Sequence, residues 1–145
     1  MDLRFGIDAY AHLGTLQNKN IGKTIAVLGS GLDEIYPKQN IELAKQIIKS
    51  GGCIISEFPL GSKPEKINFP QRNRIISGLS QGVLVVEASE NSGALITADF
   101  ALEQGKEVFA IPGNISSNSS IGTNNLIKQG AKLVTNCEEI LEEIS

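Results

Sequence analysis

The sequence contains few of the residues on which metal sites, disulfides and histidine catalysis depend. Cys53 and Cys137 are its only cysteines, they lie far apart, and His12 is its only histidine. Without a Cys-x-x-Cys pair or a nearby histidine, neither a zinc site nor a disulfide framework is indicated, and we expect no metal and no cofactor. We interpret the cysteines as small residues of the core or of helix ends, and His12 as the partner of Asp8 one helical turn earlier.

Long apolar runs are also missing. No segment approaches the roughly 20 apolar residues that span a bilayer, and residues 1–6 lack the basic and then apolar order of a secretory signal. We therefore expect a cytoplasmic protein without a membrane partner. The net charge of −3 argues against a protein that coats nucleic acid through its overall charge, so a DNA site has to be a local patch.

Familiar catalytic motifs are absent too. The sequence has no Walker A motif, and no serine has a histidine and an acid in a known hydrolase pattern. Residues 29–31 (Gly-Ser-Gly) begin like a dinucleotide-binding loop, but the third glycine is missing, and Asp33 and Glu34 would repel a pyrophosphate. We interpret Glu57 and Glu87, which end two predicted strands, as buried loop anchors and not as an acid–base pair. We therefore expect no enzyme.

What the chain does contain is a regular alternation of strands and helices. Its 145 residues and 41% hydrophobic composition are typical of one soluble globular domain, residues 1–145. Short β-branched runs bounded by Gly or Pro predict buried strands at residues 24–28, 53–57, 83–87 and 108–111.

Between these runs, apolar residues recur at helical spacing. One stripe consists of Ile41, Ala44 and Ile48, and a second, which ends at Gly105, consists of Ala94, Leu95, Ala98, Ala101 and Leu102. The alternation predicts an α/β fold, a Rossmann-like, doubly wound, mainly parallel sheet with helices on both faces. Ligands bind beyond the carboxyl ends of such strands, where we place the loops at residues 29–37, 57–70, 87–93 and 112–122.

One of these loops carries a basic patch, residues 63–74. It holds four cations, one acid and a phenylalanine in twelve residues, although the chain as a whole is acidic. Cations follow the phosphates of a single strand and an aromatic ring stacks on its bases. Because Pro70 fits a first helical turn, Phe69 lies where a helix begins. The DNA-binding candidates of this patch are Lys63, Lys66, Phe69, Arg72, Asn73 and Arg74.

Two further predicted helix starts offer backbone N–H groups to a phosphate. Ser92 and Gly93 open one helix, and we include both among the DNA-binding candidates. Residues 122–125 open the other. Helix capping is an alternative explanation for each. For the patch itself, the alternative is that Phe69 packs in the core while the arginines pair with rim carboxylates or pin neighbouring loops.

Taken together, seven motifs resemble the DNA-processing protein A (DprA/Smf) family in their order and spacing. They are GIDAYAH (6–12), TIAVLGSGLDEIYP (24–37), SEFP (56–59), FPQRNRI (69–75), VVEA (85–88), SGALITA (92–98) and VFAIPG (108–113). The resemblance runs from about Leu3 to the end of the chain. It implies a Rossmann-like fold that binds single-stranded DNA, protects incoming DNA during natural transformation and helps to load the RecA recombinase. It also implies a homodimer, and it assigns Lys66 and Phe69 to the DNA pocket, with Arg72 and Arg74 close by.

The sequence departs from this family at its start. The resemblance implies a further strand and a Gly-Ser-Arg phosphate-binding loop ahead of residues 6–12, and this sequence lacks both. We therefore expect a reduced DNA affinity and an exposed strand edge that favours pairing with another copy. Two alternatives stay open, a small-nucleotide-binding or nucleotide-hydrolysing enzyme on a related Rossmann-like fold, and a structural fragment without activity.

Overall fold

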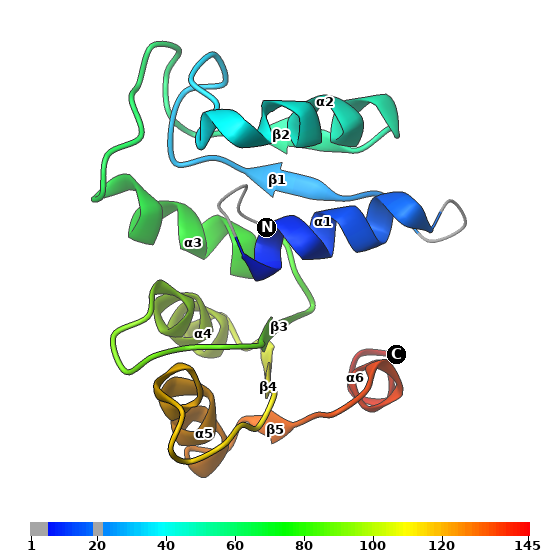
Figure 1. Ribbon diagram of the computed structural model, residues 1–145, viewed down its shortest axis with the longest axis vertical. Coiled ribbons are helices and arrows are strands. Elements are labelled where there is room, and N and C mark those ends of the chain that lie inside the picture. Colours follow the sequence, from blue (N-terminus) through cyan, green and yellow to red (C-terminus); the bar gives the residue numbers. More distant parts are fainter. Residues whose placement is uncertain (1–5, 19–21) are drawn as a thin grey trace. The chain divides into compact units, whose positions relative to one another are not determined.

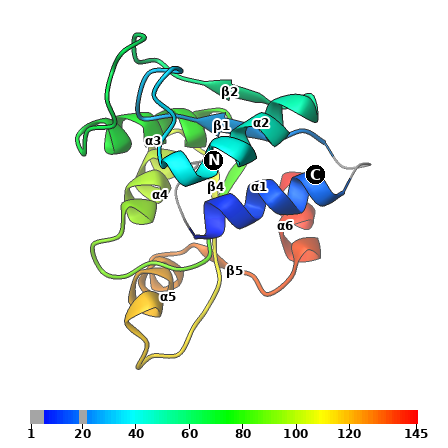
Figure 2. The same ribbon diagram turned by 45° about the horizontal axis from the view of Figure 1, so that its top comes forward.

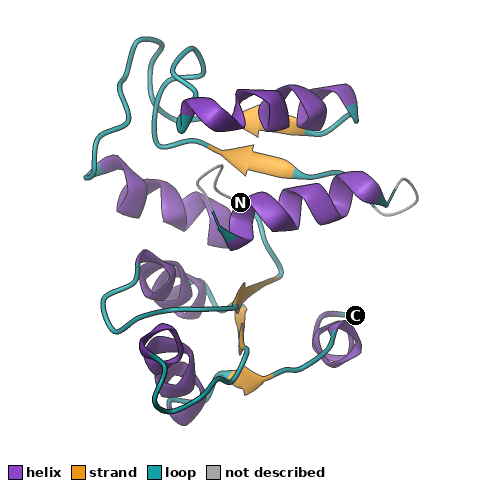
Figure 3. Ribbon diagram, viewed as in Figure 1, coloured by secondary structure: helices purple, strands orange, loops and turns teal. Residues whose placement is uncertain are grey.

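The computed structural model describes residues 6–18 and 22–145, and the chain divides into two compact units, Met1–Arg72 and Asn73–Ser145. Residues 1–5, on which the interpretation of the amino terminus rests, lie outside the described residues. Helices and strands alternate in both units, as the sequence predicts (Figure 3). Helix α3, Asn68–Gly78, contains the boundary between the units.

The first unit is built on two parallel strands. Its elements before α3 are α1 Ile7–Gln17, β1 Ile25–Val27, the 3-10 helix η1 Lys38–Asn40, α2 Ile41–Lys49 and β2 Cys53–Ile55 (Figure 1). Ile25 lies opposite Cys53 and Val27 opposite Ile55 in the ladder. The core forms where α1 and α2 pack on this pair of strands, and it contains Ala26, Leu28, Leu43, Ala44 and Ile47.

Helix α2 turns a different face inward from the one that the sequence predicts. Leu43, Ala44 and Ile47 are buried, whereas Ile41 is 37% and Ile48 59% exposed. The predicted stripe was therefore wrong at two of its three positions. Apolar residues cover more than half of this helix, so their spacing alone leaves the buried face ambiguous.

The second unit is a three-stranded parallel sheet with helices on both faces. Its elements after α3 are β3 Gly82–Val85, α4 Gly93–Glu103, β4 Glu107–Ala110, the 3-10 helix η2 Asn118–Ser120, α5 Ile121–Lys128, β5 Lys132–Leu133 and α6 Cys137–Ile144. The strand order is β3-β4-β5. Figures 1 and 2 both show α4 and α5 on one side of these strands and α6 on the other.

The core of the second unit lies beneath α4 and α5. It consists of Val85, Ala88, Ala98, Ala101, Val108, Ala110 and Leu126. Small residues on α4 let that helix approach the sheet closely. Gly105, with φ +67°, ends α4 as predicted, and the N–H of Lys106 bonds the carbonyl of Ala101 at 2.8 Å. Leu102, assigned to the buried stripe, is 58% exposed, so that prediction was wrong.

The lone histidine and the two cysteines lie in different environments, and the pairing of His12 with Asp8 stays a prediction. His12 is fully buried, and its Nδ1 lies 2.6 Å from Oγ1 of Thr24, so the histidine joins α1 to the residue before β1. Cys137 begins α6, as expected of a helix-end residue, but Cys53 is exposed on β2 and not a core residue. Among residues 6–18 and 22–145, no helix has the length and apolarity needed to cross a bilayer.

Candidate nucleic-acid interface

Two loops of the first unit follow the carboxyl ends of β1 and β2 and are hydrogen-bonded to each other. We call residues 28–37 and 56–67 the paired loops. The N–H of Gly31 donates to the carbonyl of Ser62 at 2.8 Å, and the N–H of Gly61 donates to both carboxylate oxygens of Asp33 at 2.8 and 3.0 Å. Because adjacent parallel strands end at the same edge, their loops meet where ligands bind an α/β sheet.

Close packing explains the Gly-Ser-Gly sequence at residues 29–31. A Cβ on Gly31 would lie 2.6 Å from the carbonyl oxygen of Pro59, and one on Gly29 would lie 2.8 Å from the ring of Phe69. The hydroxyl of Ser30 donates to the carbonyl of Glu34 at 2.7 Å. Contacts within the protein thus require these glycines. They account for the Gly-Ser-Gly sequence without a bound dinucleotide.

Helix α3 begins against both of the paired loops. The side-chain amide of Asn68 donates to the carbonyl of Gly29 at 3.0 Å and to the carbonyl of Lys63 at 3.3 Å. The next residue, Phe69, is partly buried and lies between three groups: Gly29, the ring of Tyr36 and the guanidinium of Arg72. The bonds of Asn68 therefore hold the lysine-bearing loop beside this ring.

Arg72 and Arg74 have opposite environments, although both belong to the predicted basic patch. Arg72 is only 1% exposed, its Nη1 donates to the carbonyl of Val27 at 2.7 Å, and its Cζ lies 5.6 Å from the centre of the Phe69 ring. Arg74 is exposed, and its carbonyl accepts from the side-chain amide of Gln104 at 3.0 Å. Arg72 thus has the position of a residue that fixes α3 to β1, and a phosphate could contact its guanidinium only if this buried side chain became exposed.

The remaining cations of the patch face solvent. Lys63 and Lys66 are exposed, and both lie in the loop that Asn68 holds. Exposed lysines next to a partly buried ring are the arrangement that single-strand-binding sites use. The structure therefore brings Lys63, Lys66 and Phe69 together in the first unit.

The candidates of the second unit surround the start of α4. Ser92 caps this helix, because its hydroxyl accepts from the N–H of Ala94 at 3.3 Å. The side-chain amide of Asn73, which is 5% exposed, donates to the carbonyl of Gly93 at 3.4 Å. Capping and loop anchoring account for these contacts, and a role of Asn73, Ser92 and Gly93 in DNA binding stays a prediction.

The other predicted helix start of the second unit is tightly packed. The N–H of Gly122 donates to the carbonyl of Ala88 at 2.8 Å, and a Cβ on Gly122 would lie 2.7 Å from the Cβ of Ala88. The side chain of Asn124 forms two hydrogen bonds with the backbone of Gly113. Its Oδ1 accepts from the N–H at 3.1 Å, and its Nδ2 donates to the carbonyl at 3.0 Å. These contacts fix the loop after β4 to α5.

The two carboxylates predicted to end strands, Glu57 and Glu87, follow β2 and β3. Both side chains are exposed, so the prediction that they are buried was wrong, and their role as loop anchors stays a prediction. Within residues 6–18 and 22–145, no group of three acidic, histidine or cysteine side chains forms a candidate metal site.

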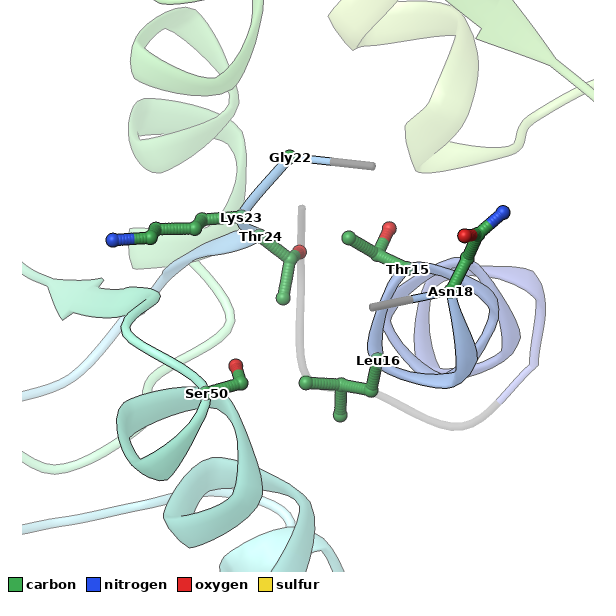
Figure 4. Close-up of a pocket in the computed structure, with 7 residues that line it drawn as sticks. All are labelled: Thr15, Leu16, Asn18, Gly22, Lys23, Thr24 and Ser50. Atoms are coloured by element: carbon green, nitrogen blue, oxygen red, sulfur yellow. The ribbon is translucent and has the colours of Figure 1, made fainter. Parts of the chain in front are cut away.

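A pocket of about 350 Å³ lies in the first unit beside residues 22–24, which precede β1 (Figure 4). Thr15, Leu16, Thr24 and Ser50 are among its lining residues. Its hydroxyl groups already have partners: Thr24 contacts His12, Thr15 donates to the carbonyl of Ala11, and Ser50 donates to the carbonyl of Ile47. The pocket therefore offers no unpartnered hydroxyl to a ligand.

Three residues of the paired loops and the start of α3 were not among the predicted site residues. Asp33 was considered only as a charge that repels pyrophosphate, Asn68 was not considered, and Tyr36 was quoted only within a motif. An Asx residue before a helix is a recognised signal for backbone hydrogen bonding, which would have pointed to Asn68. No local signal predicts that Tyr36 lies 6.2 Å from Phe69, because 32 positions separate them in the sequence.

Comparison with known proteins agrees with this architecture. The model of the DNA recombination-mediator protein A family matches residues 3–145. Protein Smf of Escherichia coli is 57% identical over 139 residues, and DNA processing protein DprA of Streptococcus pneumoniae is 51% identical over 138 residues. These alignments cover 96% and 95% of this chain but only 37% and 48% of the relatives. The chain thus spans less than half the length of these two curated relatives.

Solved structures show the same fold. The crystal structure of DprA from Streptococcus pneumoniae superimposes with a TM-score of 0.89 at 49% identity, covering 99% of this chain and 50% of that one. DNA processing protein A from Helicobacter pylori, studied for its single-stranded DNA binding mode, gives a TM-score of 0.76 at 26% identity, covering 99% and 79%. The predicted Rossmann-like α/β fold is thereby confirmed, and the chain belongs to the DNA recombination-mediator protein A family.

Proposed function

We propose that this chain binds single-stranded DNA at the paired loops and the start of α3. One observation carries the proposal: exposed Lys63 and Lys66 are held beside Phe69 at the edge where parallel strands present ligands. The single-stranded DNA binding mode described for the Helicobacter pylori relative supports it. In this role Lys63 and Lys66 pair with phosphates, and Arg74, Asn73, Ser92 and Gly93 are further candidate contacts.

The biological role that we propose is the one that the family implies. The chain takes part in DNA uptake during natural transformation in the cytoplasm, protects incoming single strands and helps to load the RecA recombinase. It acts as a homodimer and catalyses no reaction. Its relatives named as DNA processing proteins in Streptococcus pneumoniae and Bacillus subtilis support a role in DNA processing.

The test is an anisotropy titration of labelled oligo-dT and of a duplex of equal length across a salt series. We expect preference for the single strand and a linear fall of log affinity with log salt. Replacing Lys63 or Lys66 by alanine should weaken binding and reduce the slope by about 0.7 for each lost phosphate contact.

Lys45→Ala is the matched control for these variants. It removes the same charge from α2, outside the paired loops, where Lys45 pairs with Glu42 at 2.7 Å. Binding by this variant should equal that of the unaltered chain. An equal loss in Lys45→Ala and Lys66→Ala would contradict a local site, and tight binding of a mononucleotide in place of oligo-dT would favour the nucleotide-enzyme alternative.

A further inference from the structure

Two aromatic rings meet at the proposed site, and they differ in exposure. The rings of Tyr36 and Phe69 lie 6.2 Å apart between centroids and are inclined by 32°. Tyr36 is 46% exposed, whereas Phe69 is partly buried, with its ring edge against the backbone of Gly29 and the guanidinium of Arg72 5.6 Å from its centre. Tyr36 is therefore the outer ring of the pair.

We propose that Tyr36 is the ring on which an unpaired base stacks, with Phe69 and Arg72 supporting it from within the protein. The inference rests on the proposed function, because it names the group that recognises bases at that site. Offset or tilted ring pairs at this separation attract each other, so Phe69 gives the tyrosine a fixed orientation. A ring held in place before binding loses less conformational freedom when a base stacks on it.

The surroundings of Tyr36 fit an unpaired base better than a duplex. Three further apolar side chains of the paired loops are exposed: Leu32 by 47%, Leu60 by 74% and Ile67 by 66%. Leu60 and Ile67 share their loop with Lys63 and Lys66, so exposed apolar side chains and exposed lysines lie on one segment. In a duplex the base faces are covered by their neighbours, so this combination selects single strands without selecting their sequence.

The composition of the chain makes base stacking directly observable. The sequence has no tryptophan and only two tyrosines, Tyr10 and Tyr36. Tyr10 lies on α1 and is 71% exposed. In the Tyr10→Phe variant, Tyr36 is therefore the sole strong intrinsic fluorophore, and stacking of a base on its ring is expected to quench it.

We expect oligo-dT to quench the fluorescence of the Tyr10→Phe variant in step with the anisotropy change. The Tyr36→Phe variant should bind within about twofold of the unaltered chain, because it keeps the ring, and its remaining Tyr10 should show no quenching. Tyr36→Leu should weaken binding about tenfold, within the range expected for one stacked base. Tyr10→Leu, which removes the other exposed tyrosine, should leave the affinity unchanged.

Three outcomes separate the inference from the proposed function. If the unaltered chain binds no oligo-dT at low salt, both fail. If it binds but Tyr36→Leu retains full affinity and Tyr10→Phe shows no quenching, only the assignment of Tyr36 fails. If Tyr36→Leu binds weakly while Tyr10→Phe still shows no quenching, Tyr36 has a structural role, and the stacking assignment is again overturned.

Discussion

Two arginines of the basic patch, only two residues apart, differ in burial and therefore in the role that we assign to each. Arg72 and Arg74 stand in the same basic patch, yet one bonds the carbonyl of Val27 inside the first unit and the other faces solvent. A helix rotates by about 200° over two residues, so neighbours at this spacing point to nearly opposite sides. The patch is therefore smaller than its charge count indicates, and Arg72 contributes mainly through the structure.

Replacing these two arginines should separate stability from binding. Arg72→Ala removes a buried hydrogen bond and leaves a space beside Phe69, so we expect a loss of about 2–4 kcal/mol in the free energy of unfolding. Arg74→Ala should change that free energy by less than about 1 kcal/mol, because its side chain is exposed. Urea denaturation followed by far-UV circular dichroism measures both values. Similar losses in the two variants would show that Arg72 is not the anchor inferred here.

The paired loops show how an acidic side chain can serve a site for an anionic ligand. The carboxylate of Asp33 would be expected to repel DNA, yet its two oxygens share the N–H of Gly61 in a bifurcated hydrogen bond, which holds the loop that carries Lys63 and Lys66. The neighbouring Glu34 makes backbone hydrogen bonds within its own loop: its N–H donates to the carbonyl of Gly31 at 3.0 Å, and its carbonyl accepts from the hydroxyl of Ser30. If only charge mattered, removing either carboxylate would raise the affinity for DNA. The hydrogen bonds predict instead that loss of Asp33 lowers the affinity, whereas loss of Glu34 does not.

Asp33→Ala and Glu34→Ala test this distinction. We expect Asp33→Ala to weaken oligo-dT binding several-fold, because the lysine loop loses one of its attachments and more of its order has to be gained on binding. Glu34→Ala should leave the affinity unchanged or raise it slightly, because only a nearby negative charge is lost. Anisotropy at a fixed salt concentration gives both affinities, and amide exchange at Gly61 reports the freed loop. Tighter binding by Asp33→Ala would show that its charge outweighs its hydrogen bonds.

At the scale of the whole molecule, the chain divides into two compact units, and the single domain over residues 1–145 stays a prediction. Helix α3 connects them without interruption. Arg72 of this helix bonds within the first unit, and Asn73, the next residue, bonds within the second. Because unfolding α3 removes an anchor from each unit, we expect the 145 residues to unfold in a single transition.

Two probes with different locations test this cooperativity. Both tyrosines lie in the first unit, so tyrosine fluorescence reports that unit, while far-UV circular dichroism reports helices of both. Leu126→Ala, in the core of the second unit, should cost about 2–5 kcal/mol and should lower the midpoint by the same amount for both probes. Leu43→Ala in the first core is the reciprocal variant. If Leu126→Ala left the fluorescence midpoint unchanged, the two units would unfold independently.

The sequence by itself determined the alternation of strands and helices, the glycine that ends α4 and the family. These features are local, or depend on motifs whose spacing is readable along the chain. The tertiary structure alone decided which face of α2 is buried, that Arg72 is internal while Lys63 and Lys66 are exposed, and that Tyr36 meets Phe69. The physical reason is that exposure depends on what packs against a side chain. Residues 68–74 have no apolar stripe, so the sequence has no periodicity that predicts which of their side chains are buried.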